Sequence, residues 1–463
     1  MRILHLSTFD TDGGAARGSL WLHEALRRRN VDSALMVGSK RGDDPSVLRL
    51  PLLKRVAAKL RMRLDDLPLR RYEKTDESFW SVGWLPGRLD QAVKALAPDI
   101  IHLHWVGAGF LPIAALKHFH RPVVWTLRDM WSFTGGCHYT GGCDQYLEGC
   151  GACPQLNSDD PEDLSRRIWR QKQKHWRDAD LWLVPISHWL GDCARQSPLL
   201  GHLPIEVLPN GLDTAVFRPF PKATARQQFG LPNNRWIVTY GAINAMRDAR
   251  KGFRELLGAL ELLGRHPGAE KILLVVFGDL QPGDIPETGI EIRHVGYIND
   301  DERLTRLYAS SDVAVMPSLQ EAFGKTLIEA MACGTPVVAF DHGGPRDIIS
   351  HCVDGYLARP FRPDDLAQGI LWCLEQIASG NDLGAAARAK VEAEFDIEVV
   401  AARYHELYTR ILSPARRTAN DQPAAGPHQT HEYMPSFDLG NIGICSIIGQ
   451  GLAFGLGLLP LIA

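Results

Sequence analysis

The sequence predicts an α/β protein with two doubly wound domains, and three observations support this prediction. The chain has 463 residues, which is more than one domain of about 150 residues needs. Its strand-like segments are continuous apolar runs, as in parallel strands that are covered on both faces. Helix-like segments separate these runs almost throughout, and such an alternation of strand and helix builds doubly wound parallel sheets.

The expected strands fall into two series. The first series is found at residues 3–6, 34–37, 100–103, 123–126, 181–186 and 206–208. The second is found at residues 237–240, 272–277, 290–294, 313–316 and 336–340. A turn signature, Pro209-Asn210-Gly211-Leu212, lies between them and is typical of a loop between elements. We therefore expect one domain over residues 1–208 and a second over residues 209–395.

Helical spacing is clearest near the two ends of this region. Ala15, Ser19, Leu22 and Leu26 recur at intervals that place them on one face of a first helix. Residues 396–412 predict a last amphipathic helix, which we expect to cross back to the first domain. Residues 413–463 predict a polar linker followed by an apolar tail. The uncharged part at 439–463 is long enough for a membrane span of about 20 residues, but its six glycines and one proline also fit a tail that lies outside a membrane.

Composition excludes several classes of protein. Hydrophobic residues make up 45% and charged residues 23%, which is typical of a globular chain and not of a disordered or collagen-like one. The 51 Lys and Arg nearly balance the 54 Asp and Glu, so we expect no nucleic-acid partner. The apolar run after Met1 is too short for a signal peptide. This indicates a cytoplasmic protein, in which cysteines remain reduced.

The most informative motif lies between two expected strands, at residues 321–338. Glu321 and Glu329 lie eight positions apart across a junction of loop and helix, with Gly324 between them. The glycine allows a ligand to approach the backbone, and the first turn of the helix offers unpaired N–H groups to an anion. One carboxylate could hold sugar hydroxyls and the other a ribose. Two solvated glutamates on a surface helix are the alternative.

This stretch resembles the E-x7-E motif of family 4 retaining glycosyltransferases, which have the GT-B fold. The resemblance covers residues 1–412, and residues 125–156 are similar to a subgroup from bacterial exopolysaccharide clusters that includes colanic-acid-type enzymes. It implies two Rossmann-like domains facing a central cleft. It also implies that Glu321 contacts the donor sugar and Glu329 the ribose. The backbone near the sugar and diphosphate is then that of Ala322, Phe323, Gly324 and Lys325.

A basic segment follows the strand at residues 237–240. Lys251 corresponds to the diphosphate-binding lysine of the family, and a cation there would stabilise the departing diphosphate. The family commonly has an arginine where this chain has Ala242. Arg247 or Arg250 could replace it, because a guanidinium binds phosphate oxygens well. A solvated basic loop is the alternative.

The turn before the first helix contains Gly13 and Gly14. Glycines at this point let a ligand approach the helix N-terminus, and the resemblance implies a position near the donor phosphates and the acceptor. Asp10 and Asp12 have the spacing of a metal-binding DxD motif. Here the two aspartates precede a glycine loop, which is not the fold context of a metal-binding DxD motif. We therefore regard the spacing as coincidental and expect no catalytic metal.

Arg128 departs from the family pattern. The family usually has a histidine here, which contacts the donor sugar, whereas this chain has an arginine. An arginine is longer and always charged, so it could bind an acidic sugar or reduce activity. His104, on the strand at residues 100–103 or just after it, could line the same cleft. A buried structural histidine is the alternative.

Four cysteines cluster at residues 137–153 as an insertion in the first domain: Cys137, Cys143, Cys150 and Cys153. Four thiolates and glycine-rich turns suit a closed tetrahedral zinc site, so we expect a structural zinc ion that pins a loop over the acceptor side of the cleft. Their spacing is not that of a standard zinc finger, and disulfides after oxidation are an alternative.

Residues 54–71 predict an amphipathic stretch with seven basic residues and two aspartates. Such a stretch suits an anionic membrane surface, and a solvated helix face is the alternative. The resemblance implies peripheral docking at the inner face of the cell membrane, where lipid-linked acceptors are reached.

Taken together, these features predict a retaining hexosyltransferase. It would move a sugar from a nucleotide-diphospho-sugar to a lipid-linked saccharide during the synthesis of bacterial surface or exopolysaccharide, and it would need no cofactor for catalysis. Three other functions remain open: a nucleotide-sugar-binding protein without transfer activity, a GT-B epimerase or phosphorylase, and a zinc-dependent interaction module.

Overall fold

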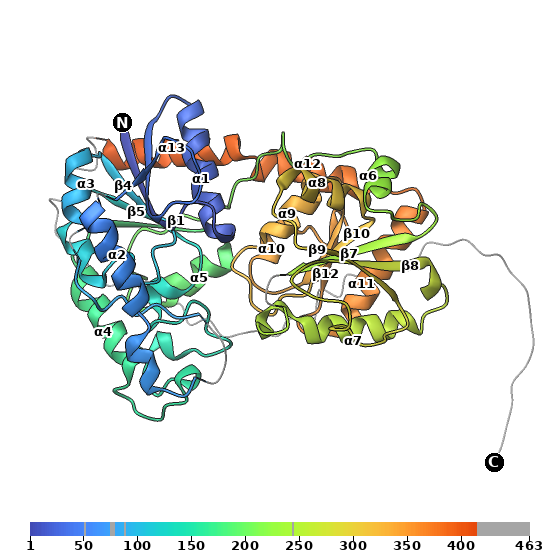
Figure 1. Cartoon of the computed structure of the whole chain (residues 1–463), viewed down its shortest axis with the longest axis horizontal. Helices are drawn as coiled ribbons and strands as arrows, with labels where there is room; N and C mark the ends of the chain where they lie inside the picture. The colour runs from blue at the N-terminus through green and yellow to red at the C-terminus, as the bar shows by residue number, and fades with distance from the viewer. Residues whose placement is uncertain (51, 75–78, 88, 243–244, 414–463) are drawn as a thin grey trace, which may run out of the picture. The chain divides into compact units, whose positions relative to one another are not determined.

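Within the described residues, two parallel six-stranded sheets form the framework of the chain (Figure 1). The computed structural model describes residues 1–50, 52–74, 79–87, 89–242 and 245–413. The first sheet has the order β3-β2-β1-β4-β5-β6. Its strands are β1 (Arg2–Phe9), β2 (Asp32–Ser39), β3 (Val47–Arg49), β4 (Ile100–Leu103), β5 (Val123–Leu127) and β6 (Leu181–Pro185).

The second sheet has the order β12-β11-β10-β7-β8-β9, so counting from its own first strand it repeats the order of the first sheet. Its strands are β7 (Trp236–Ala242), β8 (Ile272–Gly278), β9 (Glu291–Gly296), β10 (Val313–Met316), β11 (Val337–Phe340) and β12 (Gly355–Ala358). This order is that of the Rossmann fold. The prediction of two Rossmann-like α/β sheets is therefore confirmed.

Each sheet has a point where the direction of winding reverses. In the first sheet the chain moves outward from β1 to β3 and then returns to pair β4 with β1, so that Ile100 lies beside Ile3. In the second sheet β10 returns to β7, so that Val313 lies beside Val238. Loops separate at such points, and open α/β sheets bind ligands there, at the carboxyl ends of the strands.

Helices cover both sheets (Figure 1). Those of the first half are α1 (Gly13–Arg28), α2 (Leu52–Leu64), α3 (Asp90–Leu96), α4 (Leu164–Trp176) and α5 (His188–Gln196). Those of the second half are α6 (Lys222–Gln228), α7 (Phe253–Gly264), α8 (Asp301–Ser310), α9 (Lys325–Ala332), α10 (Pro345–Ile348), α11 (Pro363–Ala378), α12 (Leu383–Lys390) and α13 (Ile397–Leu412). Because helices lie on both faces, the central strands β4, β5, β10 and β11 are wholly buried.

The last helix, α13, packs against α1 and the first sheet, although it comes last in the described chain (Figure 1). Tyr404 and Tyr408 are buried in this contact. The Tyr404 hydroxyl lies 2.8 Å from Thr126 Oγ1 on β5, and the Tyr408 hydroxyl lies 2.6 Å from His102 Nδ1 on β4. The helix thus ties the end of the second half to the first sheet.

The expected strand at residues 206–208 is wrong. The segment runs beside β6, where Glu206 N–H donates to Leu183 O (3.0 Å) and Leu208 N–H donates to Pro185 O (3.1 Å), but only a single bridge forms, at Ile205. Pro185 has no N–H to return a hydrogen bond. Two strands were not predicted, β3 and β12, since both are short and neither is a continuous apolar run.

No helix among the described residues is both long and apolar enough to cross a bilayer. The apolar segment at residues 439–463 lies outside the described residues.

Candidate active site

A cleft of about 900 Å³ opens at the carboxyl ends of strands from both sheets. It lies where the two reversal points of the fold predict a ligand site. Ten of the residues predicted from the sequence line it: Gly13, Gly14, Arg128, Lys251, Glu321, Ala322, Phe323, Gly324, Lys325 and Glu329. Three others, Arg247, Arg250 and His104, do not.

Glu321 and Lys251 form an ion pair in the cleft. Lys251 Nζ lies 3.1 Å from Glu321 Oε2, and the two side chains are 29% and 17% exposed. Burial alone would raise the pKa of Glu321, but the cations of Lys251 and Arg250 outweigh it and hold that pKa below its usual value. The carboxylate is therefore charged at neutral pH and available to accept hydrogen bonds from sugar hydroxyls.

Glu329 and Lys325 form a second pair one turn into α9. Lys325 Nζ lies 3.1 Å from Glu329 Oε1, and the glutamate side chain is only 4% exposed. Lys325 Nζ also lies 3.8 Å from the centre of the Trp21 ring on α1. Burial lowers the pKa of Lys325, and the Glu329 carboxylate partly offsets that effect. Lys325, at the start of α9 in the second half of the chain, thus also contacts α1 of the first half.

The loop between these carboxylates depends on glycine. Gly324 has a φ of 107°, and a Cβ there would lie 2.9 Å from Met316 Cε. As the N-cap of α9, Gly324 provides no side-chain cap, so N–H groups of the first turn of α9 are available to an anion. Behind the loop, Gly344 N–H donates to Glu321 O (2.9 Å), and a Cβ on Gly344 would lie 2.6 Å from Phe323 N.

The N-terminus of α1 faces the same cleft. Gly13 has a φ of 81°, and a Cβ on Gly14 would come within 3.8 Å of Lys325 Cδ. Asp12, at the N-cap, makes no side-chain cap hydrogen bond. One turn later, Arg17 forms an ion pair with Asp301 of α8. The glycine turn therefore places an uncapped helix end beside the α9 loop.

The basic segment before α7 contributes Lys251 alone to the cleft. Gly252 has a φ of 65°, and a Cβ there would overlap Pro317 O at 1.6 Å, so glycine is required where the chain turns after Lys251. Arg250 pairs with Asp248 (2.6 Å) and lies 4.0 Å from the centre of the Tyr139 ring. Arg247 is exposed. Neither arginine therefore occupies the cleft in place of the arginine that the family has at position 242.

Arg128 leaves the end of β5 and lines the cleft. Its NH1 donates to Asn210 Oδ1 (2.5 Å), and its NH2 lies 3.2 Å from His104 Nδ1. Burial lowers the pKa of Arg128 to about 10, which leaves the group charged at neutral pH. A Cβ at Gly18 would lie 2.7 Å from NH1, so the bare helix surface at Gly18 makes room for the guanidinium.

His104 lies behind Arg128, in a buried group of histidines. His5 Nδ1 lies 2.8 Å from His104 Nε2, and His102 is hydrogen-bonded to Tyr408 and Thr126. Burial lowers the pKa of all three histidines well below the usual value, so they are neutral. These rings support β1 and β4 and do not contact the cleft, which is the structural role left open for His104.

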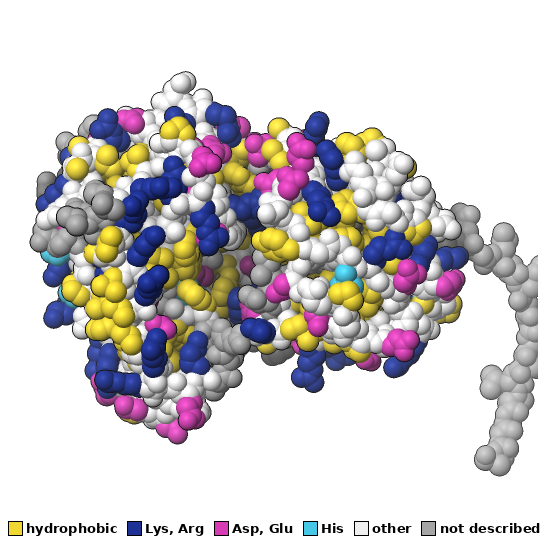
Figure 2. All heavy atoms as spheres, viewed as in Figure 1, with side chains coloured by type: hydrophobic (Ala, Val, Ile, Leu, Met, Phe, Trp, Pro, Cys, Tyr) yellow, Lys and Arg dark blue, Asp and Glu magenta, His cyan; other side chains and the backbone are white. Residues whose placement is uncertain are grey.

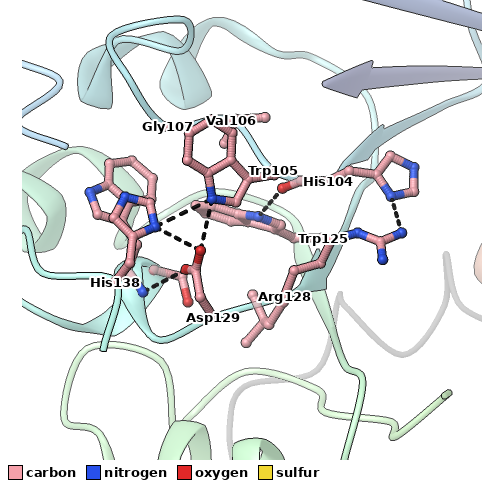
Figure 3. Close-up of a pocket in the computed structure, with 11 residues that line it drawn as sticks. His104, Trp105, Val106, Gly107, Trp125, Arg128, Asp129 and His138 are labelled. Atoms are coloured by element: carbon pink, nitrogen blue, oxygen red, sulfur yellow. Dashed lines mark hydrogen bonds and ion pairs between the residues drawn. The ribbon is translucent and has the colours of Figure 1, made fainter. Parts of the chain in front are cut away.

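A smaller cavity beside the cleft holds a hydrogen-bonded chain (Figure 3). Ser81 Oγ lies 2.8 Å from His138 Nε2, and His138 Nδ1 lies 2.7 Å from Asp129 Oδ2. Trp105 Nε1 donates to the same Asp129 oxygen (2.8 Å). Burial alone would raise the pKa of Asp129, but His138, Trp105 and the Trp131 N–H outweigh it and lower that pKa. Trp105 and Asp129 line this cavity and also the main cleft.

The cleft also contains residues that were not predicted, among them Trp21, Trp105, Asp129, Tyr139 and Asp301. Asp129 directly follows Arg128, so its position after a strand was a usable signal. Tyr139 comes from the cysteine-rich insertion, next to the loops that carry Arg250 and Ala322. No local pattern in the sequence indicates that contact, because it joins segments that are far apart in the chain.

The four clustered cysteines are free thiols, and Cys143 is less buried than the others. Burial raises the pKa of Cys150 to about 12 and that of Cys153 to about 11. Among the described His, Cys, Asp and Glu side chains, ligand atoms meet within 4.8 Å in groups of three or more only at His5, His102 and His104. The cysteines therefore do not assemble a tetrahedral donor set as arranged here, and the zinc ion stays a prediction.

Two protein families match this chain. Residues 12–216 match the family described as Glycosyltransferase Family 4, and residues 221–390 match the one described as Glycosyl transferases group 1. The chain is 25% identical over 372 residues to the putative colanic acid biosynthesis glycosyl transferase WcaC of Escherichia coli, covering 75% of this chain and 85% of WcaC. It is 30% identical over 343 residues to D-inositol 3-phosphate glycosyltransferase 2 of Catenulispora acidiphila, covering 71% of this chain and 74% of that relative.

Solved structures share the fold. Sucrose-phosphate synthase from Thermosynechococcus elongatus superposes with a TM-score of 0.62 at 22% identity, over 89% of this chain and 99% of that one. Anabaena Alr3699/HepE in complex with UDP-glucose superposes with a TM-score of 0.61 at 20% identity, over 89% of this chain and 100% of that one. The chain therefore belongs to the group 1 glycosyl transferases of glycosyltransferase family 4, and it is a glycosyltransferase with the GT-B fold.

Proposed function

We propose that this glycosyltransferase holds a nucleotide-diphospho-sugar in the cleft between its two sheets and transfers the sugar with retention of configuration. One observation carries the proposal: two lysine–glutamate pairs, Lys251–Glu321 and Lys325–Glu329, meet an uncapped N-terminus of α9 in one cleft. Cations and free N–H groups suit a diphosphate, whereas the carboxylates suit sugar and ribose hydroxyls.

The diphosphate is proposed to lie between Lys251 Nζ and the first turn of α9. Negative charge grows on this group as the glycosidic bond breaks, and donors fixed in advance stabilise that charge without reorganising. Glu321 would orient the donor sugar through its hydroxyls, and Glu329 would hold the ribose. The departing phosphate oxygen would accept the proton of the acceptor hydroxyl on the same face of the sugar, so no protein base is required.

The acceptor is proposed to be a lipid-linked saccharide in the synthesis of a bacterial surface or exopolysaccharide. The similarity to WcaC supports this class of pathway. The α2 surface supports membrane contact, since Val56 and Leu60 are 59% and 56% exposed beside Lys59 and Arg63. Figure 2 shows basic and hydrophobic side chains close together over this part of the molecule. An exposed apolar and basic helix face binds anionic lipid surfaces.

The test is nucleoside-diphosphate release from a panel of UDP-, GDP- and ADP-sugars, with a membrane lipid extract as the acceptor source. The complexes of Alr3699/HepE with UDP and UDP-glucose make the UDP-sugars the first donors to try. Release that depends on the extract and is lost in Glu321→Ala and Lys251→Ala is the expected result. Lys271→Ala, on an exposed lysine away from the cleft, should leave the rate unchanged.

Arg128 favours a second candidate, a nucleotide-sugar-binding protein without turnover, because it stands where the family usually has a histidine. Saturable donor binding with no release from any donor and extract would support that candidate. Restoration of release by Arg128→His would then assign the loss to this position.

A further inference from the structure

Arg128 brings a positive charge to the cleft that no described carboxylate neutralises. Its NH1 donates to the amide oxygen of Asn210 (2.5 Å) and its NH2 lies 3.2 Å from His104 Nδ1. Both partners are neutral, since burial keeps His104 unprotonated. The Nε atom is buried and has no hydrogen-bond partner. A buried charge without a counter-charge costs free energy, so an anionic partner at this point of the cleft would be stabilising.

The three other cations of the cleft differ in this respect. Lys251 pairs with Glu321, Lys325 pairs with Glu329, and Arg17 pairs with Asp301. Within the described part of the chain, Arg128 is thus the cation of the cleft that lacks a carboxylate within ion-pair distance.

Asp129 does not fill that role, although it follows Arg128 directly. Its Oδ2 accepts hydrogen bonds from His138 (2.7 Å) and Trp105 (2.8 Å), and its Oδ1 accepts one from the Trp131 N–H (2.9 Å). These donors hold the carboxylate away from the guanidinium (Figure 3). Asp129 therefore favours the charged form of Arg128 from a distance without forming an ion pair with it.

We propose that Arg128 binds the carboxylate of a uronic acid sugar in the cleft, so that the enzyme acts on acidic sugars. This inference rests on the proposed function and names its substrate class. The planar guanidinium matches a carboxylate in two parallel hydrogen bonds. After the contacts with Asn210 and His104, NH1 and NH2 each keep one further N–H for such a partner. The diphosphate is the less suitable anion, because Lys251 and the N-terminus of α9 already provide for it on the second sheet, whereas Arg128 belongs to the first.

The carboxylate could belong to the transferred sugar or to a sugar of the acceptor, and two titrations distinguish these sources. In the first, calorimetry follows the titration of sugar nucleotides into the full chain. They form three pairs of acidic and neutral sugars: UDP-glucuronate and UDP-glucose, UDP-galacturonate and UDP-galactose, and GDP-mannuronate and GDP-mannose. In the second, methyl β-glucuronide and methyl β-glucoside are titrated into the chain saturated with the matching nucleoside diphosphate. Each is repeated with Arg128→Gln, Arg128→Lys and the control Arg170→Gln, whose side chain is exposed and paired with Glu162.

The expected result is a uronate that binds about 10- to 100-fold more tightly than its neutral counterpart in one of the two titrations. Arg128→Gln should abolish this preference by weakening the binding of the uronate. Arg128→Lys should retain part of it, because it keeps the charge but not the fork. Arg170→Gln should bind as the wild type does.

Two other results would overturn the inference. Equal binding of uronate and neutral sugars in both titrations would overturn the inference about Arg128, but it would not contradict the proposed function. Failure of every nucleotide and sugar nucleotide to bind would overturn the proposed function as well.

Thermal unfolding distinguishes a binding role of Arg128 from a structural one. Arg128→Gln should unfold at the wild-type temperature or above it, since it removes an uncompensated charge. A large fall in the unfolding temperature would assign Arg128 a structural role and overturn the inference.

Discussion

Replacing Lys251 with methionine should separate the catalytic role of this lysine from its contribution to stability. Lys251 Nζ lies 3.1 Å from Glu321 Oε2, and at an effective dielectric constant of about 20 two such charges attract by roughly 5 kcal/mol. Desolvation and the ordering of two partly exposed side chains offset most of that attraction, so the net loss of unfolding free energy should be about 1 kcal/mol. Catalysis should suffer far more, because a donor fixed near developing charge contributes about 10²- to 10³-fold to the rate.

The assay measures nucleoside-diphosphate release at saturating donor together with unfolding in urea. We expect kcat to fall about 10²- to 10³-fold in Lys251→Met, with a small shift in the urea midpoint. Lys271→Met is the matched control on an exposed lysine and should change neither. A fall in kcat of less than about tenfold, or a loss of stability equal in size to the loss of catalysis, would contradict a catalytic role for Lys251.

Four further predictions follow from other parts of the chain. Gly252→Ala should destabilise the fold by roughly 3 kcal/mol in urea, since its Cβ would overlap Pro317 O. Gly268→Ala, with nothing within 4 Å of the added Cβ, should cost far less; equal losses would contradict the clash. Burial lowers the pKa of His23 to about 4, and the unfolded chain takes up its proton near pH 6.5, so unfolding free energy should fall by about 3 kcal/mol as pH falls between these values. A His23→Gln variant with the same pH dependence would oppose that assignment. If residues 137–153 hold zinc, atomic emission should find it in stoichiometric amount in the purified protein; metal-free, folded and active protein would reject it. Finally, Leu60→Glu should weaken binding to anionic lipid vesicles in a sedimentation assay, while Val353→Glu, equally exposed but elsewhere, should not; equal effects would count against α2 as the contact.

The sequence predicted the sheets well, because buried parallel strands are continuous apolar runs. Residues 100–103 and 313–316 were predicted with the bounds of β4 and β10. The prediction failed where apolar content and hydrogen bonding disagree. Residues 206–208 run beside β6 as a strand would, but the neighbouring Pro185 cannot complete the ladder. In contrast β12 pairs fully with β11 although it begins with a glycine.

The candidate site was predicted in part, and the reason lies in how each residue is positioned. Glu321, Gly324 and Glu329 belong to one local loop and helix, so their spacing alone brings them together. Tyr139 reaches the same cleft from the cysteine-rich insertion of the first half of the chain, and only the fold reveals that contact. His104 has the chemistry of a ligand, but its neighbour His5 holds it in a buried network, which no local pattern indicates.

Arg250 shows a related difficulty. The sequence places it beside Lys251, and both are cations after the same strand. A short helical turn directs only Lys251 to the cleft, while Arg250 lies on the Tyr139 ring. Side-chain direction within such a turn depends on partners from other segments, and those partners are known only from the structure.

The most direct test of the central claim is a crystal structure of the protein with the nucleoside diphosphate that it releases. We expect the diphosphate within hydrogen-bond distance of Lys251 Nζ and of the N–H groups of the first turn of α9, with the ribose hydroxyls on Glu329. A nucleotide bound anywhere other than the cleft, or a diphosphate that contacts neither Lys251 nor α9, would contradict it.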